Sequence, residues 1–163
     1  MRSLFQQNEG QRIGLLAPLL LAASILLACA GGNPGAGAGA GASAAVTRPA
    51  QLDTATTQLS ENGLYRIRFA ADQEPIPVSK LHTWTVHVDT AAGTAVVDAV
   101  VSVQGGMPEH NHGMPTQPQV TSLGGGDYLV EGMKFQMPGW WTVTVAVEVA
   151  GQTDRATFNL LLS

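Results

Sequence analysis

Apolar and polar residues alternate along most of the chain after residue 58, and this alternation limits the fold more than any other feature. In the clearest stretch, Trp141, Val143, Val145 and Val147 are separated by threonine or alanine. Successive side chains of a β-strand point to opposite faces, so this spacing places all four on one face of a sheet. No part of this region repeats its apolar residues with the period of an amphipathic helix. The pattern therefore predicts an all-β domain.

Similar alternation recurs in segments separated by glycine- and proline-containing turns. Its apolar faces are formed by Tyr65, Ile67 and Phe69; His82, Trp84, Val86 and Val88; Val97, Ala99, Val101 and Val103; and Ala156, Phe158 and Leu160. We expect about seven strands in an immunoglobulin-like antiparallel β-sandwich, with a small barrel as the alternative. Residues 58–163 are long enough to bury one core of this kind.

The N-terminal region has the features of an export signal. Arg2 and Arg12 precede an apolar run over residues 13–28, which is short for a membrane-spanning helix. The run ends at Leu26 to Cys29 in LLAC, which resembles a bacterial lipobox. That resemblance implies cleavage after residue 28 and lipidation of Cys29, and Ala30 in the next position favours the outer membrane. A spanning anchor with an unmodified cysteine is the alternative.

The mature protein is then expected to consist of a tether and one domain. Residues 29–57 begin with the lipidated Cys29 and continue through a Gly/Ala-rich stretch that lacks core-forming side chains. Cys29 is the only cysteine, so the domain over residues 58–163 has no disulfide, zinc–thiolate site or thiol nucleophile. A soft-metal site in this domain would have to use methionine and histidine.

Charge and residue pattern narrow the range of functions. Without residues 1–28 the chain has 6 basic and 11 acidic side chains, a formal charge of −5. This balance disfavours nucleic acid as a partner. We find no serine or cysteine nucleophile paired with histidine and no two carboxylates bracketing a cleft, so we do not expect an enzyme.

The segment from Met107 to Pro115, MPEHNHGMP, concentrates potential metal ligands. It contains Met107, His110, His112 and Met114, including half of the four histidines of the chain. Thioethers favour Cu(I), and imidazoles accept copper in either oxidation state. We expect a loop in which His110 and His112 point to one side, with Gly113 free to adopt a positive φ. The pattern predicts a copper site.

Two further residues are expected at the same end of the sandwich. If each connection reverses the chain, the strand beginning near His82 and the turn containing Met137 lie beside this loop. We therefore include His82 and Met137 as candidate ligands. The alternatives are a hydrogen-bonded core role for His82 and core packing for Met107, Met114 and Met137, because methionine fills irregular gaps well.

The loop and the segment after it resemble the YtkA-like and FixH-like group of exported bacterial domains. The matching positions are Met107, Pro108, His110, His112, Gly113, Gly126, Tyr128, Gly132, Phe135, Met137, Gly139 and Trp141. The resemblance covers roughly residues 60–150 of this sequence. It implies an immunoglobulin-like sandwich, often membrane-anchored, and often found with copper-handling or cytochrome oxidase assembly proteins.

Two functions remain open from the sequence. The first is a periplasmic lipoprotein that stores, delivers or buffers copper and meets a copper-handling or respiratory-complex partner. The second is an accessory domain that uses the same loop, without metal, to contact a periplasmic or membrane partner.

Replacing Cys29 with alanine tests the lipid anchor. The Cys29→Ala variant should remain an unlipidated precursor, because the thioether acceptor is lost, and this can be measured by radiolabelled fatty-acid incorporation and mass spectrometry. Cleavage at the same bond, with the product still in the membrane fraction, would contradict the lipobox.

Overall fold

A computed structural model describes residues 46–163, and its nine strands pair only in antiparallel fashion. The predicted signal peptide, Cys29 and the first part of the tether lie outside the described residues. The strands are β1 (Thr57–Leu59), β2 (Tyr65–Ala71), β3 (His82–Thr90), β4 (Val100–Met107), β5 (His112–Gly113), β6 (Gln119–Gly124), β7 (Asp127–Met133), β8 (Gly139–Val149) and β9 (Gln152–Leu162). Within this range we find no helix that is long and apolar enough to cross a membrane.

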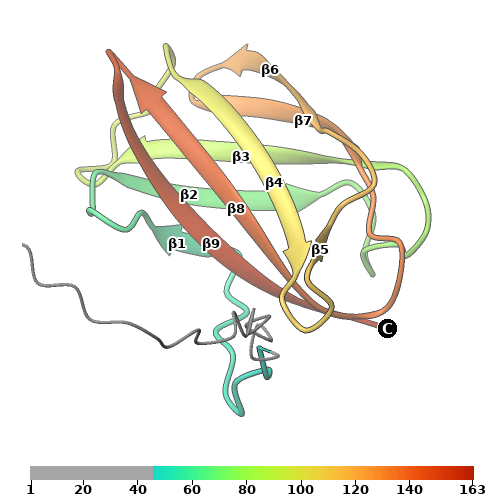
Figure 1. Cartoon of the computed structure of the whole chain (residues 1–163). Helices are drawn as coiled ribbons and strands as arrows, with labels where there is room; N and C mark the ends of the chain where they lie inside the picture. Colours follow the sequence, from blue (N-terminus) through green and yellow to red (C-terminus); the bar gives the residue numbers. More distant parts are fainter. Residues whose placement is uncertain (1–45) are drawn as a thin grey trace, which may run out of the picture. The chain divides into compact units, whose positions relative to one another are not determined.

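The strands form two sheets that pack face to face. One sheet has the order β1-β2-β3-β7-β6 and the other has the order β5-β4-β8-β9 (Figure 1). The predicted all-β sandwich is therefore confirmed. The structure has nine strands rather than about seven, because β1 and β5, with three and two residues, are too short to show an alternating pattern.

The core lies between the sheets and is built from the apolar faces of the alternating segments. Ile67 and Val86 from the first sheet, and Val143, Val145 and Phe158 from the second, are all completely buried. Polar and charged residues at the intervening positions are directed away from this core. The alternation of the sequence is thus the alternation of burial along each strand.

The segment before β4 departs from the predicted pattern. Val97 is 47% exposed, whereas Val101 and Val103 are buried as expected. Val96 is still held by the first sheet through its amide, which donates to the Val88 carbonyl at 2.9 Å. The chain then crosses to the second sheet before Val100, so residues 97–99 belong to a crossover and the prediction for Val97 was wrong.

Asp154 closes the sandwich on the side where β1 and β9 meet. This carboxylate is 2% exposed and accepts hydrogen bonds from the amides of Asn62, Leu64 and Arg155. Burial raises the pKa of Asp154, but these bonds and one from Ser60 outweigh that effect and lower it to about 2. The ionised form therefore fixes the turn between β1 and β2 against β9.

Asp154→Asn should lower the free energy of unfolding by about 2 kcal/mol, because a charged acceptor of several hydrogen bonds is lost. The wild-type pKa is lower than the usual 3.8, so this contribution is present above pH 3.8 and is lost as the pH falls toward 2. Urea denaturation at pH 7 and at pH 2.5 measures both effects. The exposed Glu148→Gln variant is the control, and equal loss in both variants would contradict this role.

Candidate functional site

Three chain connections meet at one end of the sandwich, as the alternation of strand direction predicts. The β2–β3 connection touches the β7–β8 connection, because the Ser79 amide donates to the Phe135 carbonyl at 2.6 Å. The next residue, Gln136, reaches the β4–β5 hairpin, where its side-chain nitrogen lies 3.1 Å from the Gly113 carbonyl and 3.0 Å from His112 Nδ1. Figure 1 shows these connections at the end where β3 and β8 begin.

The histidines lie on a tight hairpin rather than on an extended loop. Met107 pairs with His112 across β4 and β5, and the His110 amide donates to the Met107 carbonyl at 3.1 Å. The left-handed residue is Asn111, with φ of 52°, and not Gly113 as expected. Asparagine tolerates this conformation because its short side chain can bond locally. The expectation of an extended backbone between the two histidines was therefore wrong.

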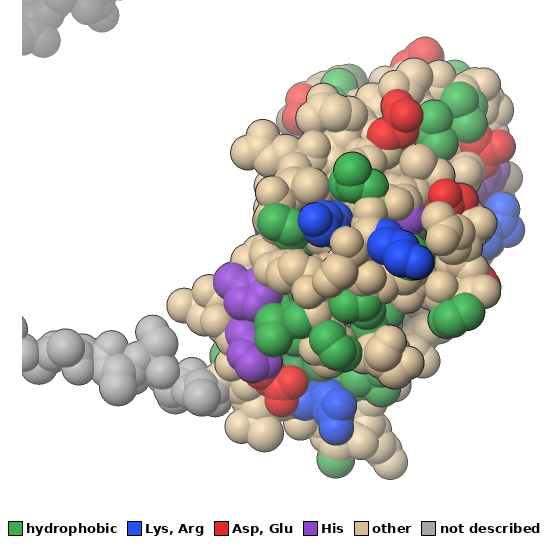
Figure 2. Space-filling model, turned by 90° about the vertical axis from the view of Figure 1, so that its right-hand side faces the viewer, with side chains coloured by type: hydrophobic (Ala, Val, Ile, Leu, Met, Phe, Trp, Pro, Cys, Tyr) green, Lys and Arg blue, Asp and Glu red, His purple; other side chains and the backbone are tan. Residues whose placement is uncertain are grey.

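The hairpin nevertheless brings the two imidazoles together. The ring centroids of His110 and His112 are 5.9 Å apart, with His110 exposed and His112 half-buried. His112 also rests on Trp141, with a centroid distance of 5.7 Å in an edge-on arrangement. An open hollow of about 400 Å³ lies beside this ring, lined by Gly106, Met107, Pro108, Asn111, His112, Gly113 and Thr142. Figure 2 shows histidine side chains at the surface against hydrophobic ones.

Met107 is part of the core. It is 1% exposed, and its methyl carbon lies 2.7 Å from the position that a Cβ on Gly139 would occupy. Cross-strand partners in an antiparallel ladder share a face, so the Met107 side chain lies beside that of His112. Its thioether therefore supports the hairpin from inside, which matches the core-packing alternative.

Met114 and Met137 are half-buried at the margin of the core. The side chain of Met114 covers Gly105, where a Cβ would meet its sulfur at 3.1 Å. The carbonyl of Met137 accepts a hydrogen bond from Trp141 Nε1 at 3.0 Å. Of the candidate methionines, Met114 is the one that is both next to the histidines in the chain and only partly covered.

His82 is placed in the core. It is 3% exposed, its Nδ1 lies 3.2 Å from the Lys80 carbonyl, and its buried Nε2 has no partner. Phe135 packs on His82 at 5.4 Å and on Trp141 at 5.0 Å. His82 is therefore connected to His112 only through the rings of Phe135 and Trp141. It does not reach the surface hollow beside the hairpin.

Gln136 and Trp141 hold His112 but were not predicted as site residues. The Gly113 carbonyl accepts from the Gln136 amide nitrogen, and it also accepts from His112 Nδ1 when that ring nitrogen carries the proton. In this tautomer the lone pair of Nε2 is free for another ligand. The Gln136 oxygen is buried without a hydrogen-bond partner. The position of Gln136 next to Met137 could have indicated this role, because the turn containing Met137 was already expected beside the hairpin.

The donor set at the hairpin suits a soft or borderline metal. Among residues 46–163 we find no group of three or more histidine, cysteine, aspartate or glutamate side chains that could hold a metal ion. Two neighbouring imidazoles do not make such a group, and methionine is not one of its residue types. Imidazole and thioether are nevertheless both ligands that copper accepts. Glu109, in the same turn, is the nearest carboxylate in the sequence and is exposed.

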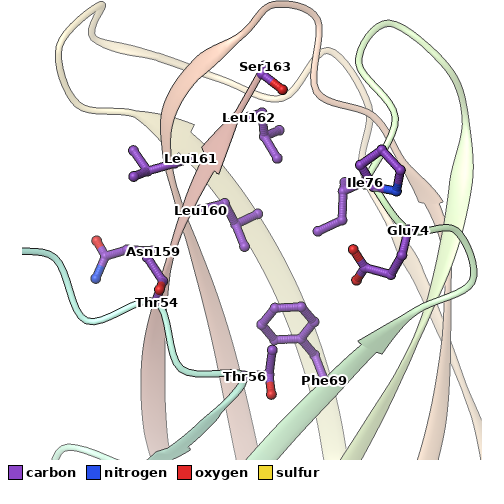
Figure 3. A pocket seen from close by; sticks show the side chains of 11 residues that line it. Thr54, Thr56, Phe69, Glu74, Ile76, Asn159, Leu160, Leu161, Leu162 and Ser163 are labelled. Atoms are coloured by element: carbon purple, nitrogen blue, oxygen red, sulfur yellow. The ribbon is translucent and has the colours of Figure 1, made fainter.

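A separate hollow of about 360 Å³ has a different character. It lies between residues 54–56, the β2–β3 connection and the end of β9 (Figure 3). Phe69, Ile76, Leu160 and Leu162 point into it, and Glu74 is its acidic side chain. With neither histidine nor methionine in its lining, it does not compete with the hairpin as a site for copper.

Comparison with known families agrees with the loop and strand pattern. A family model described as YtkA-like matches residues 65–146, which include β2 to most of β8 and the whole hairpin. The chain belongs to the YtkA-like family. The match covers His82, both hairpin histidines, Met114 and Gln136.

Other comparisons give only distant likenesses to the YtkA-like domain. No curated protein matches the chain. A DUF4426 family protein from Pseudomonas aeruginosa PAO1 is similar in structure, with a TM-score of 0.46, 15% identity, and 66% of this chain and 94% of that chain covered. A DUF4785 family protein from Legionella pneumophila has a TM-score of 0.43 and 11% identity, and the match covers 63% of this chain and 29% of the Legionella protein.

Replacing Gly139 tests the support beneath the hairpin of the YtkA-like domain. Gly139→Ala should destabilise the fold by about 1–3 kcal/mol, because φ of 132° is strained for alanine and the new methyl group meets Met107. Gly151→Ala, with φ of 80° and open space around it, gives the cost of alanine at a positive φ without a steric contact. Thermal denaturation should show a larger loss at Gly139, and equal losses would contradict the contact with Met107.

Proposed function

We propose that the chain is a periplasmic lipoprotein that binds copper through His110, His112 and Met114 for storage, delivery or buffering. The observation that carries this proposal is the 5.9 Å separation of the two imidazole rings beside an open hollow. Neutral imidazole is a good ligand for Cu(II) and is also accepted by Cu(I). The proposal assigns binding and exchange of the ion, with no catalytic turnover.

The surroundings of His112 support its role as the fixed ligand. Metal-binding histidines usually have one ring nitrogen held by a polar group, which fixes the orientation of the other. The Gly113 carbonyl lies 3.1 Å from Nδ1 of His112 and accepts its proton, the Gln136 amide donates to the same carbonyl, and Trp141 packs edge-on against the ring. His110 is exposed and lies in a turn, so it is suited to close on an ion already held by His112.

The thioether of Met114 supplies preference for the reduced ion. Its side chain is half-buried over Gly105, and the Met114 amide donates to the Gly105 carbonyl at 3.0 Å. Its side chain lines the neighbouring hollow beside Ser102–Gly105, so copper binding requires it to turn toward His112. Met107 is fully packed, so we assign it support of the hairpin, and we assign packing roles to His82 and Met137.

The expected anchor supports a function near a membrane. Lipidation of Cys29 with more than one acyl chain gives stable attachment. The predicted tether after Cys29 then allows the domain to sample the space around its anchor, although its last residues belong to the domain, since Asp53 accepts a hydrogen bond from Asn159 and Thr57 begins β1. This arrangement suits exchange of copper with a membrane-bound copper-handling or respiratory-complex partner. On the basis of Ala30 we propose that the lipid anchor lies in the outer membrane.

A second function, contact with a partner without metal, is favoured because side chains of the loop already contact other parts of the domain. His112 is held by Gln136, and Met107 is in the core. The same hairpin then serves as a rigid tip that contacts a periplasmic partner without metal. Copper affinity separates the two functions directly.

Paired variants test copper binding. The double variant His110→Asn with His112→Asn should weaken Cu(II) by at least about tenfold, as loss of even a supporting group does at metal sites. Met114→Leu should weaken Cu(I) and cost less than about 1.5 kcal/mol of stability. Both affinities are measured against competing chelators.

Matched changes elsewhere provide the controls. His87→Asn and Met133→Leu alter the same residue types away from the hairpin and should leave copper affinity unchanged. Quenching of tryptophan fluorescence by bound Cu(II) should depend mainly on Trp141, which contacts His112 at 5.7 Å. If neither hairpin variant changes either affinity, the metal-free contact function replaces copper binding.

A further inference from the structure

One long edge of β4 is bare over most of its length. Residues Val100–Gly106 pair with β8 on one side, but on the other side β5 pairs only with Gly106 and Met107, and the Met114 amide donates to the Gly105 carbonyl. In the described part of the chain, no strand pairs with the outer edge of residues 100–104. The outer strand of the opposite sheet, β6, contacts β4 along this side of the sandwich. An unpaired edge presents backbone donors and acceptors that another strand can satisfy.

The opposite side of the sandwich is closed. There β9 is the outer strand, and the Glu61 amide donates to the Arg155 carbonyl at 2.8 Å. The side chain of Asn159 donates to the Asp53 carbonyl at 3.0 Å, and Asp154 fixes the β1–β2 turn. The chain thus covers one edge with its own segments and leaves residues 100–104 of β4 without a paired strand.

A hollow of about 430 Å³ lies directly beside the bare edge. Its lining comes from Ser102–Gly105 of β4 and from the segment over residues 113–119 that leads to β6. Met114, Thr116 and Pro118 give this second wall a mixed polar and apolar surface. A strand added to β4 would direct alternate side chains toward this hollow, since successive residues point to opposite faces.

The edge also lacks the charges that normally block pairing. Glu109 is the only acidic or basic residue between residues 99 and 126, and it lies in the hairpin turn. On the two outer strands, Val100 is 69% exposed and Leu123 is 59% exposed. Soluble proteins usually protect exposed edges with lysine, proline or a bulge, and residues 100–104 have no lysine or proline.

We propose that residues 100–104 of β4 accept an extended, uncharged peptide segment of a partner protein as an added strand. Backbone hydrogen bonds to β4 supply the affinity, and apolar or small side chains at alternate positions enter the hollow beside Met114. This surface includes Met114 of the proposed copper site but neither His110 nor His112, so the inference does not depend on copper binding.

A second copy of this chain fits the edge less well than a free peptide. In a copy, the inward side chains of β4 are Val101 and Val103, which are 8% and 4% exposed because they fill its own core. They would leave the hollow beside Met114 empty. A flexible peptide has free side chains that can fill it, so we assign the edge to a peptide.

Selection from a random heptapeptide library displayed on phage tests the edge, with the full chain in detergent as the target. Selected peptides should be uncharged, with apolar or small residues at alternate positions. Their synthetic forms should bind the Ser102→Lys variant at least about tenfold more weakly, because lysine on an edge strand opposes pairing. The Thr153→Lys variant on β9 is the matched control and should bind as the wild type does.

A synthetic peptide methylated on alternate backbone nitrogens tests strand pairing without any change to the protein. It should lose binding to the wild-type chain, since those nitrogens no longer donate. Failure to enrich peptides, or equal binding by the methylated peptide, would overturn the proposal. Light scattering that shows a wild-type dimer dissociated by Ser102→Lys would also overturn it, by assigning the edge to a second copy.

Discussion

The segment from Phe135 to Gly139 holds the candidate site together, because it joins both sheets and the three connections at one end. Its backbone accepts a hydrogen bond from Ser79, and Gln136 binds the hairpin at His112 and Gly113. Gly139 leaves the space that the Met107 methyl group occupies. The hairpin is therefore held from the side by an amide and from below by a thioether. Without these contacts, a turn of four exposed or half-buried residues would have little to fix its histidines.

The histidine and methionine side chains at this end of the sandwich have two different roles. Met107 and His82 are buried and stabilise the end of the core, whereas His110 remains at the surface and His112 stands at the boundary. Burial of a polar ring costs free energy unless it is hydrogen-bonded, and His82 retains only one such contact, through Nδ1. The result is a small, partly preformed donor set in place of the six-residue site that the sequence alone suggested.

The period-two alternation was sufficient to predict the fold class, because burial between two sheets imposes that period on every long strand. It also predicted which connections meet near Met107 and His112, since strand direction alternates. It could not predict β1 and β5, which are too short to carry a period, or the crossover at Val97. It also could not predict contacts that depend on the direction of a side chain. The hydrogen bond from Gln136 to the hairpin depends on the turn that ends at Gly139, and Met107 points inward because Gly139 has no side chain in its way. The assignment of copper stays a proposal that only binding experiments can test.

X-ray absorption spectroscopy of the copper-loaded chain tests copper binding at the hairpin, since it identifies the atoms bound to the ion. The account predicts imidazole scattering for Cu(II) that is lost when His110 and His112 are both replaced by asparagine. It predicts an additional sulfur neighbour for Cu(I) that disappears in the Met114→Leu variant. A wild-type spectrum with only oxygen neighbours, or one that neither set of changes alters, would contradict copper binding at the hairpin.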